Sequence, residues 1–135
     1  MSDFRRVTDE FTTAPQISVA DVAEAARQGF RTIINNRPDG ESPDQPTSAE
    51  MEAAAKAAGL AYHHIPVSGG PTPAQVEQTQ ALLAEAEAPV LAFCRSGTRS
   101  IVTWSLGQAS AGEKSRSELI ALGRDAGYDL SGVLG

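Results

Sequence analysis

The chain contains a single cysteine, Cys94, and the residues that follow it are of types that bind anions. An apolar run ends on this cysteine, and the loop RSGTRS, residues 95–100, then supplies hydroxyl groups, a glycine and two arginines. A helix that starts after such a loop adds backbone donors and the positive end of its dipole. Both a helix N-terminus and a neighbouring arginine favour a thiolate over a thiol. The pattern therefore predicts that Cys94 is a nucleophile and that Arg99 stabilises its charge.

The rest of the loop is predicted to bind the anionic substrate. Hydroxyl side chains donate hydrogen bonds, glycine lets the backbone approach a ligand closely, and a guanidinium at the rim can steer an anion inward. The residues assigned to this role are Arg95, Ser96, Gly97, Thr98 and Ser100. Two alternatives stay open at this point: Cys94 as an ordinary buried residue at a strand end, and Arg95 as a solvated surface residue.

Short apolar strands alternate with helical segments, which predicts a single α/β domain over residues 1–135 with a mostly parallel sheet flanked by helices. A strand pair is expected within residues 4–16, with a turn at TDE. Further strands are expected at residues 30–36, 60–67 and 89–93, and helices at 19–29, 49–59, 73–87, 100–111 and 115–127. The expected N-caps are Ser18, Thr72, and either Thr47 or Ser48. Loops 36–46, 67–72 and 94–100 leave the C-terminal ends of strands, where sites of such sheets collect, so they should share one crevice.

Composition limits the classes of function. One cysteine excludes an internal disulfide and is typical of a reducing compartment, and the N-terminus has no apolar signal segment, so a cytoplasmic protein is expected. The net charge is −6, with the acidic surplus in residues 38–93, which disfavours nucleic acid and membrane partners. His63 and His64 are adjacent, so on a strand they face opposite sides, and neither a metal site nor a cofactor is predicted.

The loop CRSGTRS resembles the Cys-x-x-Gly-x-Arg loop of rhodanese-type sulfurtransferases and the His-Cys-x5-Arg loop of tyrosine and dual-specificity phosphatases. Together with APQIS, GFRTIINNRPDGE and HHIPV, it resembles the phosphatase-like domain family of beta-lactamase-hydrolase-like proteins over nearly all of the chain. This resemblance implies a dual-specificity-phosphatase-like fold and either phosphatase or sulfurtransferase activity. It also implies that Arg37 contacts the substrate, and that the domain occurs alone or fused to persulfide dioxygenase and related sulfide-oxidising modules.

Three departures from the phosphatase pattern favour sulfur chemistry. Four residues separate Cys94 from Arg99, one fewer than in phosphatases, and this tighter loop suits one sulfur atom better than a phosphoryl group. Phe93 stands where phosphatases of this fold have a histidine. The segment IPVSGGPTPAQ lacks the aspartate that protonates a leaving alcohol, so Asp39 is the candidate stand-in for the general acid.

The function predicted from the sequence is therefore transfer of sulfane sulfur through a Cys94 persulfide, from a small anionic donor to a thiol acceptor. The first alternative is a cysteine-based phosphatase that hydrolyses phosphate monoesters through a phosphoenzyme on the same residue. The second alternative is a catalytically silent module that binds an anionic partner. Sulfide-oxidising proteins such as a persulfide dioxygenase are the partners that the resemblance implies.

Overall fold

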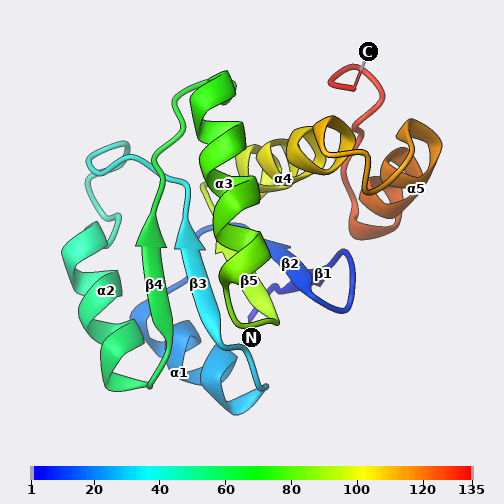
Figure 1. The fold of residues 1–135 in the computed structure, drawn as a ribbon. Coiled ribbons are helices and arrows are strands. Elements are labelled where there is room, and N and C mark those ends of the chain that lie inside the picture. The colour runs from blue at the N-terminus through cyan, green and yellow to red at the C-terminus, as the bar shows by residue number, and fades with distance from the viewer. Residues whose placement is uncertain (1, 135) are drawn as a thin grey trace.

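Five strands form one sheet in the computed structural model, which describes residues 2–134 (Figure 1). Their order across the sheet is β1-β2-β5-β3-β4. Strands β2, β5, β3 and β4 are parallel, and β1 pairs with β2 in the antiparallel sense. The strands are β1 (Arg5–Arg6), β2 (Phe11–Ala14), β3 (Thr32–Asn35), β4 (Ala61–His64) and β5 (Val90–Phe93). The mostly parallel sheet and the N-terminal strand pair predicted from the sequence are confirmed.

The five helices begin and end close to the predicted positions. They are α1 (Val19–Arg27), α2 (Ser48–Ala57), α3 (Pro73–Glu85), α4 (Thr98–Ser110) and α5 (Arg116–Ala126). Ser18, Thr47 and Thr72 cap α1, α2 and α3 by accepting hydrogen bonds from backbone amides in the first turn, as expected for N-cap residues. Helix α4 begins two residues earlier than predicted, because Gly97 adopts a left-handed conformation and serves as its N-cap. Thr98, Arg99 and Ser100, which were predicted as loop residues, therefore lie in the first turn of α4.

Helices cover both faces of the sheet. Along β3 and β5, side chains alternate between two cores: Ile33 and Leu91 pack with α1 and α2, whereas Ile34 and Ala92 pack with α4 and α5. In Figure 1, α1 lies behind the sheet, α2 lies at the left beside β4, α3 lies in front of the sheet, and α4 and α5 lie to the right. Burial on both faces explains why VLAF, the sequence of β5, is apolar throughout.

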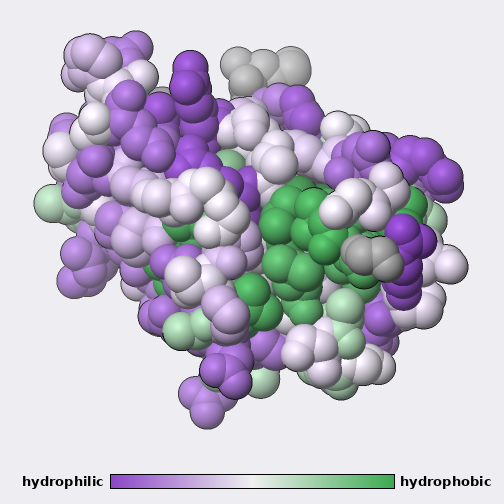
Figure 2. Space-filling model, turned by 90° about the horizontal axis from the view of Figure 1, so that it is seen from above, coloured by the Kyte–Doolittle hydropathy of each residue, from purple (hydrophilic) through white to green (hydrophobic). Residues whose placement is uncertain are grey.

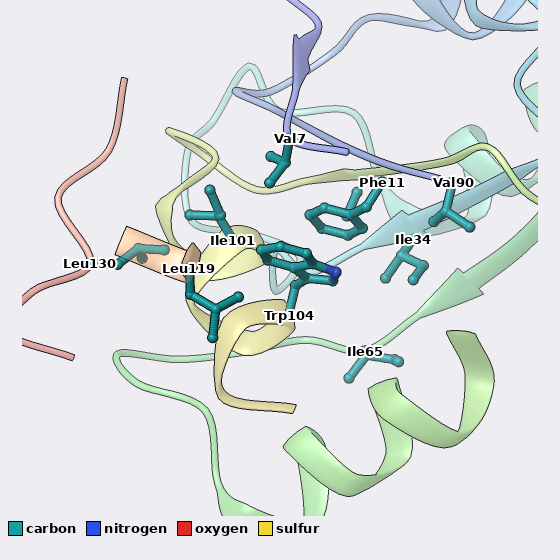
Figure 3. Close-up of a cluster of buried hydrophobic side chains, with 10 residues drawn as sticks. Val7, Phe11, Ile34, Ile65, Val90, Ile101, Trp104, Leu119 and Leu130 are labelled. Atoms are coloured by element: carbon teal, nitrogen blue, oxygen red, sulfur yellow. The ribbon is translucent and has the colours of Figure 1, made fainter. Parts of the chain in front are cut away.

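Trp104 fixes α4 against the sheet. Its ring stacks on Phe11 of β2, with centroids 5.0 Å apart and ring planes inclined by 7°. Figure 3 shows this pair at the centre of a cluster that also includes Ile101 and Leu119. Trp104 is buried and belongs to this core. This packing places the N-terminus of α4 at the carboxyl end of β5, where the cysteine lies.

The outer surface is mostly hydrophilic. Figure 2 shows one face, in which one large apolar area lies among mostly hydrophilic residues. The large hydrophobic residues that are exposed within residues 2–134 are Val19 and Val133. No helix of these residues combines the length and apolarity needed to cross a membrane.

Candidate active site

Cys94 follows directly on β5 and is fully buried, but its sulfur is not sealed among hydrocarbon groups. The backbone N–H of Gly97 donates a hydrogen bond to Cys94 Sγ over 3.1 Å. Gly97 has φ of +91°, a conformation that L-residues with side chains rarely adopt. Gly97 was predicted to let the backbone approach a ligand closely; in the structure its amide lies against the sulfur of Cys94.

Three successive carbonyl groups of the loop, those of residues 95–97, are held by donors from outside it. The donors are, in order, Gln16 N (3.2 Å), Tyr128 Oη (2.8 Å) and Thr13 Oγ1 (2.8 Å). In a trans peptide the carbonyl and the next N–H point in opposite directions, so the bond from Tyr128 to the carbonyl of Ser96 turns the Gly97 amide toward the sulfur. Tyr128 was missed by sequence reasoning, because it lies beyond α5 and carries no motif.

The hydroxyl groups of the loop do not all face the sulfur as predicted. Ser96 and Thr98 are exposed and bond to each other, with 3.0 Å between their hydroxyl oxygens. Ser100 is buried and donates to Asn36 Oδ1 over 2.8 Å, which ties α4 to the end of β3. Arg95 is exposed, which agrees with a position at the rim. Ser100 therefore has a structural contact in place of the free donor that was expected.

Arg99 joins the three loops that were predicted to share one crevice. Its two terminal nitrogens each lie 2.8 Å from a carboxylate oxygen of Glu41, in loop 36–46. Its Nη1 also donates to the carbonyl of Val67, at the start of loop 67–72, over 2.8 Å. The hydrogen bonds that Arg99 donates to Glu41 raise the pKa of Arg99, and the nearby Cys94 raises this pKa further through charge and hydrogen bonding. The guanidinium thus lies close to the sulfur but is already paired.

Glu41 also pairs with Arg37, so one carboxylate is shared by two guanidinium groups. Arg37 is buried and donates from Nε to Glu41 Oε1 over 3.0 Å and from Nη1 to Gln16 Oε1 over 3.0 Å. The hydrogen bonds from Arg99 and Arg37 lower the pKa of Glu41 from 4.5 to about 2, and the bond from Arg99 is the largest cause. Sequence reasoning placed Arg37 near the site but gave Glu41 no role. The available signal was the spacing of four positions between Arg37 and Glu41, which allows the two side chains to form an ion pair.

Asp39, the proposed stand-in for the general acid, is engaged elsewhere. Its Oδ1 accepts a hydrogen bond from the backbone amide of Ser48 over 2.7 Å, at the N-terminus of α2. An aspartate in this position stabilises the helix start. The described contacts of Asp39 therefore support a structural role and give no support to proton donation at Cys94.

The polar residues that end β3 and β4, Asn35 and His64, also have structural contacts. His64 is half-buried and its Nε2 lies 2.9 Å from the carbonyl of Arg37, whereas His63 is exposed. Asn35 Oδ1 accepts from the backbone amide of Arg37 over 2.9 Å. Within residues 2–134, no three metal-ligating side chains lie together. These groups hold loop 36–46 in place beside the cysteine.

Comparison with known proteins shows the family to which the chain belongs. The family described as "Beta-lactamase hydrolase-like protein, phosphatase-like domain" matches residues 3–111. The chain belongs to this family. The phosphatase-like domain is 44% identical over 126 residues to a beta-lactamase hydrolase-like protein of Agrobacterium fabrum, and 39% identical over 125 residues to one of Xylella fastidiosa. These matches cover 93% and 92% of the chain but 29% of each relative, so the chain spans less than a third of their length.

Solved structures share the fold of this phosphatase-like domain. A "putative phosphatase" from Neisseria meningitidis superposes with a TM-score of 0.87 and 33% identity, covering 99% of this chain and 95% of the other. Tk-PTP in its active form superposes with a TM-score of 0.76 and 18% identity, covering 98% and 90%. The expected cysteine-phosphatase-like fold is confirmed. The comparisons agree with a cysteine-based enzyme and favour the phosphatase alternative over the sulfurtransferase prediction.

Proposed function

We propose that the domain transfers sulfane sulfur through a persulfide on Cys94. The observation that supports this most directly is the pairing of Arg99 with Glu41, with both terminal nitrogens bonded to the carboxylate over 2.8 Å. The phosphoryl group of a monoester carries up to two negative charges, shared by three oxygens, and a free planar guanidinium suits their binding. Sulfur transfer places no oxyanion on Arg99, and the amide of Gly97 already donates to Cys94 Sγ, the sulfur that carries the charge of the thiolate.

The proposed reaction has two balanced half-reactions. The Cys94 thiolate attacks the terminal sulfur of a persulfide donor, a new S–S bond forms, and the electron pair of the old S–S bond leaves with the donor thiolate. An acceptor thiolate then attacks the outer sulfur of the Cys94 persulfide and regenerates the Cys94 thiolate, which gives ping-pong kinetics. The Gly97 amide stabilises the negative charge of the thiolate on Cys94 Sγ, and the N-terminus of α4 favours negative charge on sulfur in both forms.

Neither half-reaction requires a general acid, because the leaving group is a thiolate. Expulsion of an alkoxide from a phosphate ester is accelerated about 10²–10⁴-fold by a positioned acid. Asp39 is bonded to the start of α2, and residues 67–72 contain no carboxylate. Neither Asp39 nor loop 67–72 therefore supplies an acid that could protonate an alkoxide, whereas a thiolate leaves without one.

A second candidate function is hydrolysis of phosphate monoesters, which the similarity to the Neisseria meningitidis structure favours. In that reaction Cys94 attacks phosphorus, the alcohol leaves, and water releases phosphate from the cysteine. Arg99 would have to leave Glu41 in order to bind the phosphoryl oxygens.

The two candidates are separated by incubating the protein with glutathione persulfide and, in parallel, with p-nitrophenyl phosphate. Sulfur transfer predicts a gain of one sulfur atom in intact mass, located on Cys94 and absent in Cys94→Ser. Release of p-nitrophenol by the wild type but not by Cys94→Ser, without sulfur uptake, would establish the phosphatase instead. Sulfate binding without either reaction would leave the silent anion-binding module. If sulfur transfer is observed, enzymes that form or oxidise persulfides are the partners to examine first.

A further inference from the structure

Two guanidinium groups and two potential anions meet beside the cysteine loop. Arg37 and Arg99 both bond to the carboxylate of Glu41, and Arg99 also interacts with Cys94. With Cys94 as a thiolate, the formal charges of these four groups cancel. His64, on the neighbouring strand, bonds to the carbonyl of Arg37. Arg95 is exposed at the rim. The site therefore lacks the excess positive charge that a divalent anion needs.

The carboxylate of Glu41 occupies the positions that two oxygens of a bound oxyanion would take. Its Oε2 lies 2.8 Å from Nη1 of Arg99 and its Oε1 lies 2.8 Å from Nη2, the paired geometry by which arginine binds carboxylate, sulfate or phosphate. The side chains are largely enclosed, with 17% of Arg99 and 30% of Glu41 exposed. A bound oxyanion must displace this carboxylate or lie beside it, and either outcome weakens binding more strongly as the charge of the ligand increases.

We infer that Glu41 determines the specificity of the site by charge: it excludes divalent oxyanions and selects sulfur donors that carry a single negative charge. This inference rests on the proposed sulfur transfer for the class of donor, which is an organic persulfide in preference to thiosulfate. The exclusion of sulfate and phosphate esters follows from the charges alone.

The binding arm of the test measures protection of Cys94 by sulfate against alkylation by iodoacetamide, a small uncharged reagent. Glu41→Gln keeps the shape of the side chain and removes its charge, so sulfate should protect at a concentration at least tenfold lower than in the wild type. Glu52→Gln is the matched control, because Glu52 loses the same charge on the surface of α2, where it pairs with Lys56. Equal protection in the wild type and Glu41→Gln would overturn the inference.

A second variant separates charge from the positioning of Arg99. Glu41→Asp retains the carboxylate but shortens its reach, so it should continue to exclude sulfate. If Glu41→Asp admits sulfate as readily as Glu41→Gln, altered geometry of Arg99 is responsible and the inference is wrong. The melting temperatures of the variants show whether each remains folded during the assay.

The turnover arm compares glutathione persulfide with thiosulfate as donors. The ratio of kcat/KM for the persulfide to that for thiosulfate should fall at least tenfold in Glu41→Gln and stay unchanged in Glu52→Gln. If the wild type acquires no sulfur from either donor, the proposed function fails, whereas the sulfate measurement still decides the role of Glu41. If sulfur is transferred and the ratio does not change, the inference on specificity fails alone.

Discussion

At the scale of single residues, the site depends on a carboxylate held between two arginines. Arg37 is buried and Arg99 is largely enclosed, so each needs an anionic partner to offset its removal from water. Glu41 serves both and is itself kept ionised by them. The same residue therefore contributes to the stability of the fold and to the charge of the site.

The stabilisation by Glu41 should depend on pH. Its pKa is lowered from 4.5 to about 2 in the folded protein, so its contribution is complete above pH about 5 and is lost as the pH falls toward 2. The difference in free energy of unfolding between the wild type and Glu41→Gln should be constant from pH 7 to pH 5 and shrink below pH 4.5. Urea denaturation at pH 7, 5, 4 and 3 measures it. A difference that stays constant down to pH 3 would contradict this assignment.

Gly97→Ala should damage both the fold and the site. A side chain at φ of +91° is strained, and the added methyl group would overlap the hydroxyl of Tyr128. We expect a loss of about 1–3 kcal/mol in unfolding free energy and a larger relative loss of sulfur transfer, because the Gly97 amide shifts away from Sγ. Gly112→Ala is the control, since Gly112 also has positive φ but no atom near its Cβ position. Partial recovery in the double variant Gly97→Ala, Tyr128→Phe would identify the overlap as part of the cost.

At the scale of elements, the cysteine loop is oriented by segments that precede and follow it at a distance. Thr13 of β2, Gln16 after β2 and Tyr128 after α5 all donate to its carbonyls. The loop conformation is therefore a property of the packing between β2, β5 and the end of α5, and its six residues alone do not determine it.

Tyr128→Phe should loosen the loop without unfolding the protein. It removes the 2.8 Å hydrogen bond to the carbonyl of Ser96, which costs about 1 kcal/mol in unfolding free energy. The alkylation rate of Cys94 should rise and the rate of sulfur transfer should fall, because the Gly97 amide is less well fixed. Asp129→Asn perturbs the hydrogen bonds to Ser131 in the same segment without touching the loop, and it should leave both rates unchanged. Equal rates in Tyr128→Phe and the wild type would remove Tyr128 from the site.

Local sequence signals predict the elements well, because caps and apolar periodicity act over a few residues. Ser18 and Thr72 mark helix starts, whereas the sequence placed the start of α4 two residues beyond the one that Gly97 sets. Contacts between distant residues leave no such signal. Glu41 lies 58 residues from Arg99, and Tyr128 lies 32 residues from Ser96, so neither pairing follows from spacing. Asp39 illustrates the opposite error, because a carboxylate in the right loop bonds to α2 instead.

At the scale of the whole molecule, the net negative charge repels the anionic substrate that we expect. The net charge is −6, and its acidic surplus lies in residues 38–93, which include loop 36–46 after its first two residues, α2 and α3. At the site, the positive charges of Arg37 and Arg99 offset the negative charges of Glu41 and of a Cys94 thiolate. The net charge of the molecule then acts to repel an anionic donor as it approaches.

Salt should therefore accelerate the reaction with charged donors. Raising the ionic strength from low to physiological values screens the repulsion, and we expect about a twofold increase in kcat/KM for a negatively charged persulfide. An uncharged alkyl trisulfide should show no such increase, which makes it the control donor. A decrease with salt for the charged donor would mean that local attraction by Arg95 outweighs the net charge.

The complete burial of Cys94 restricts what can reach it. A reactant has to carry its reactive atom at the end of a narrow, unbranched chain. Two folded proteins therefore cannot become cross-linked through this thiol unless the loop opens.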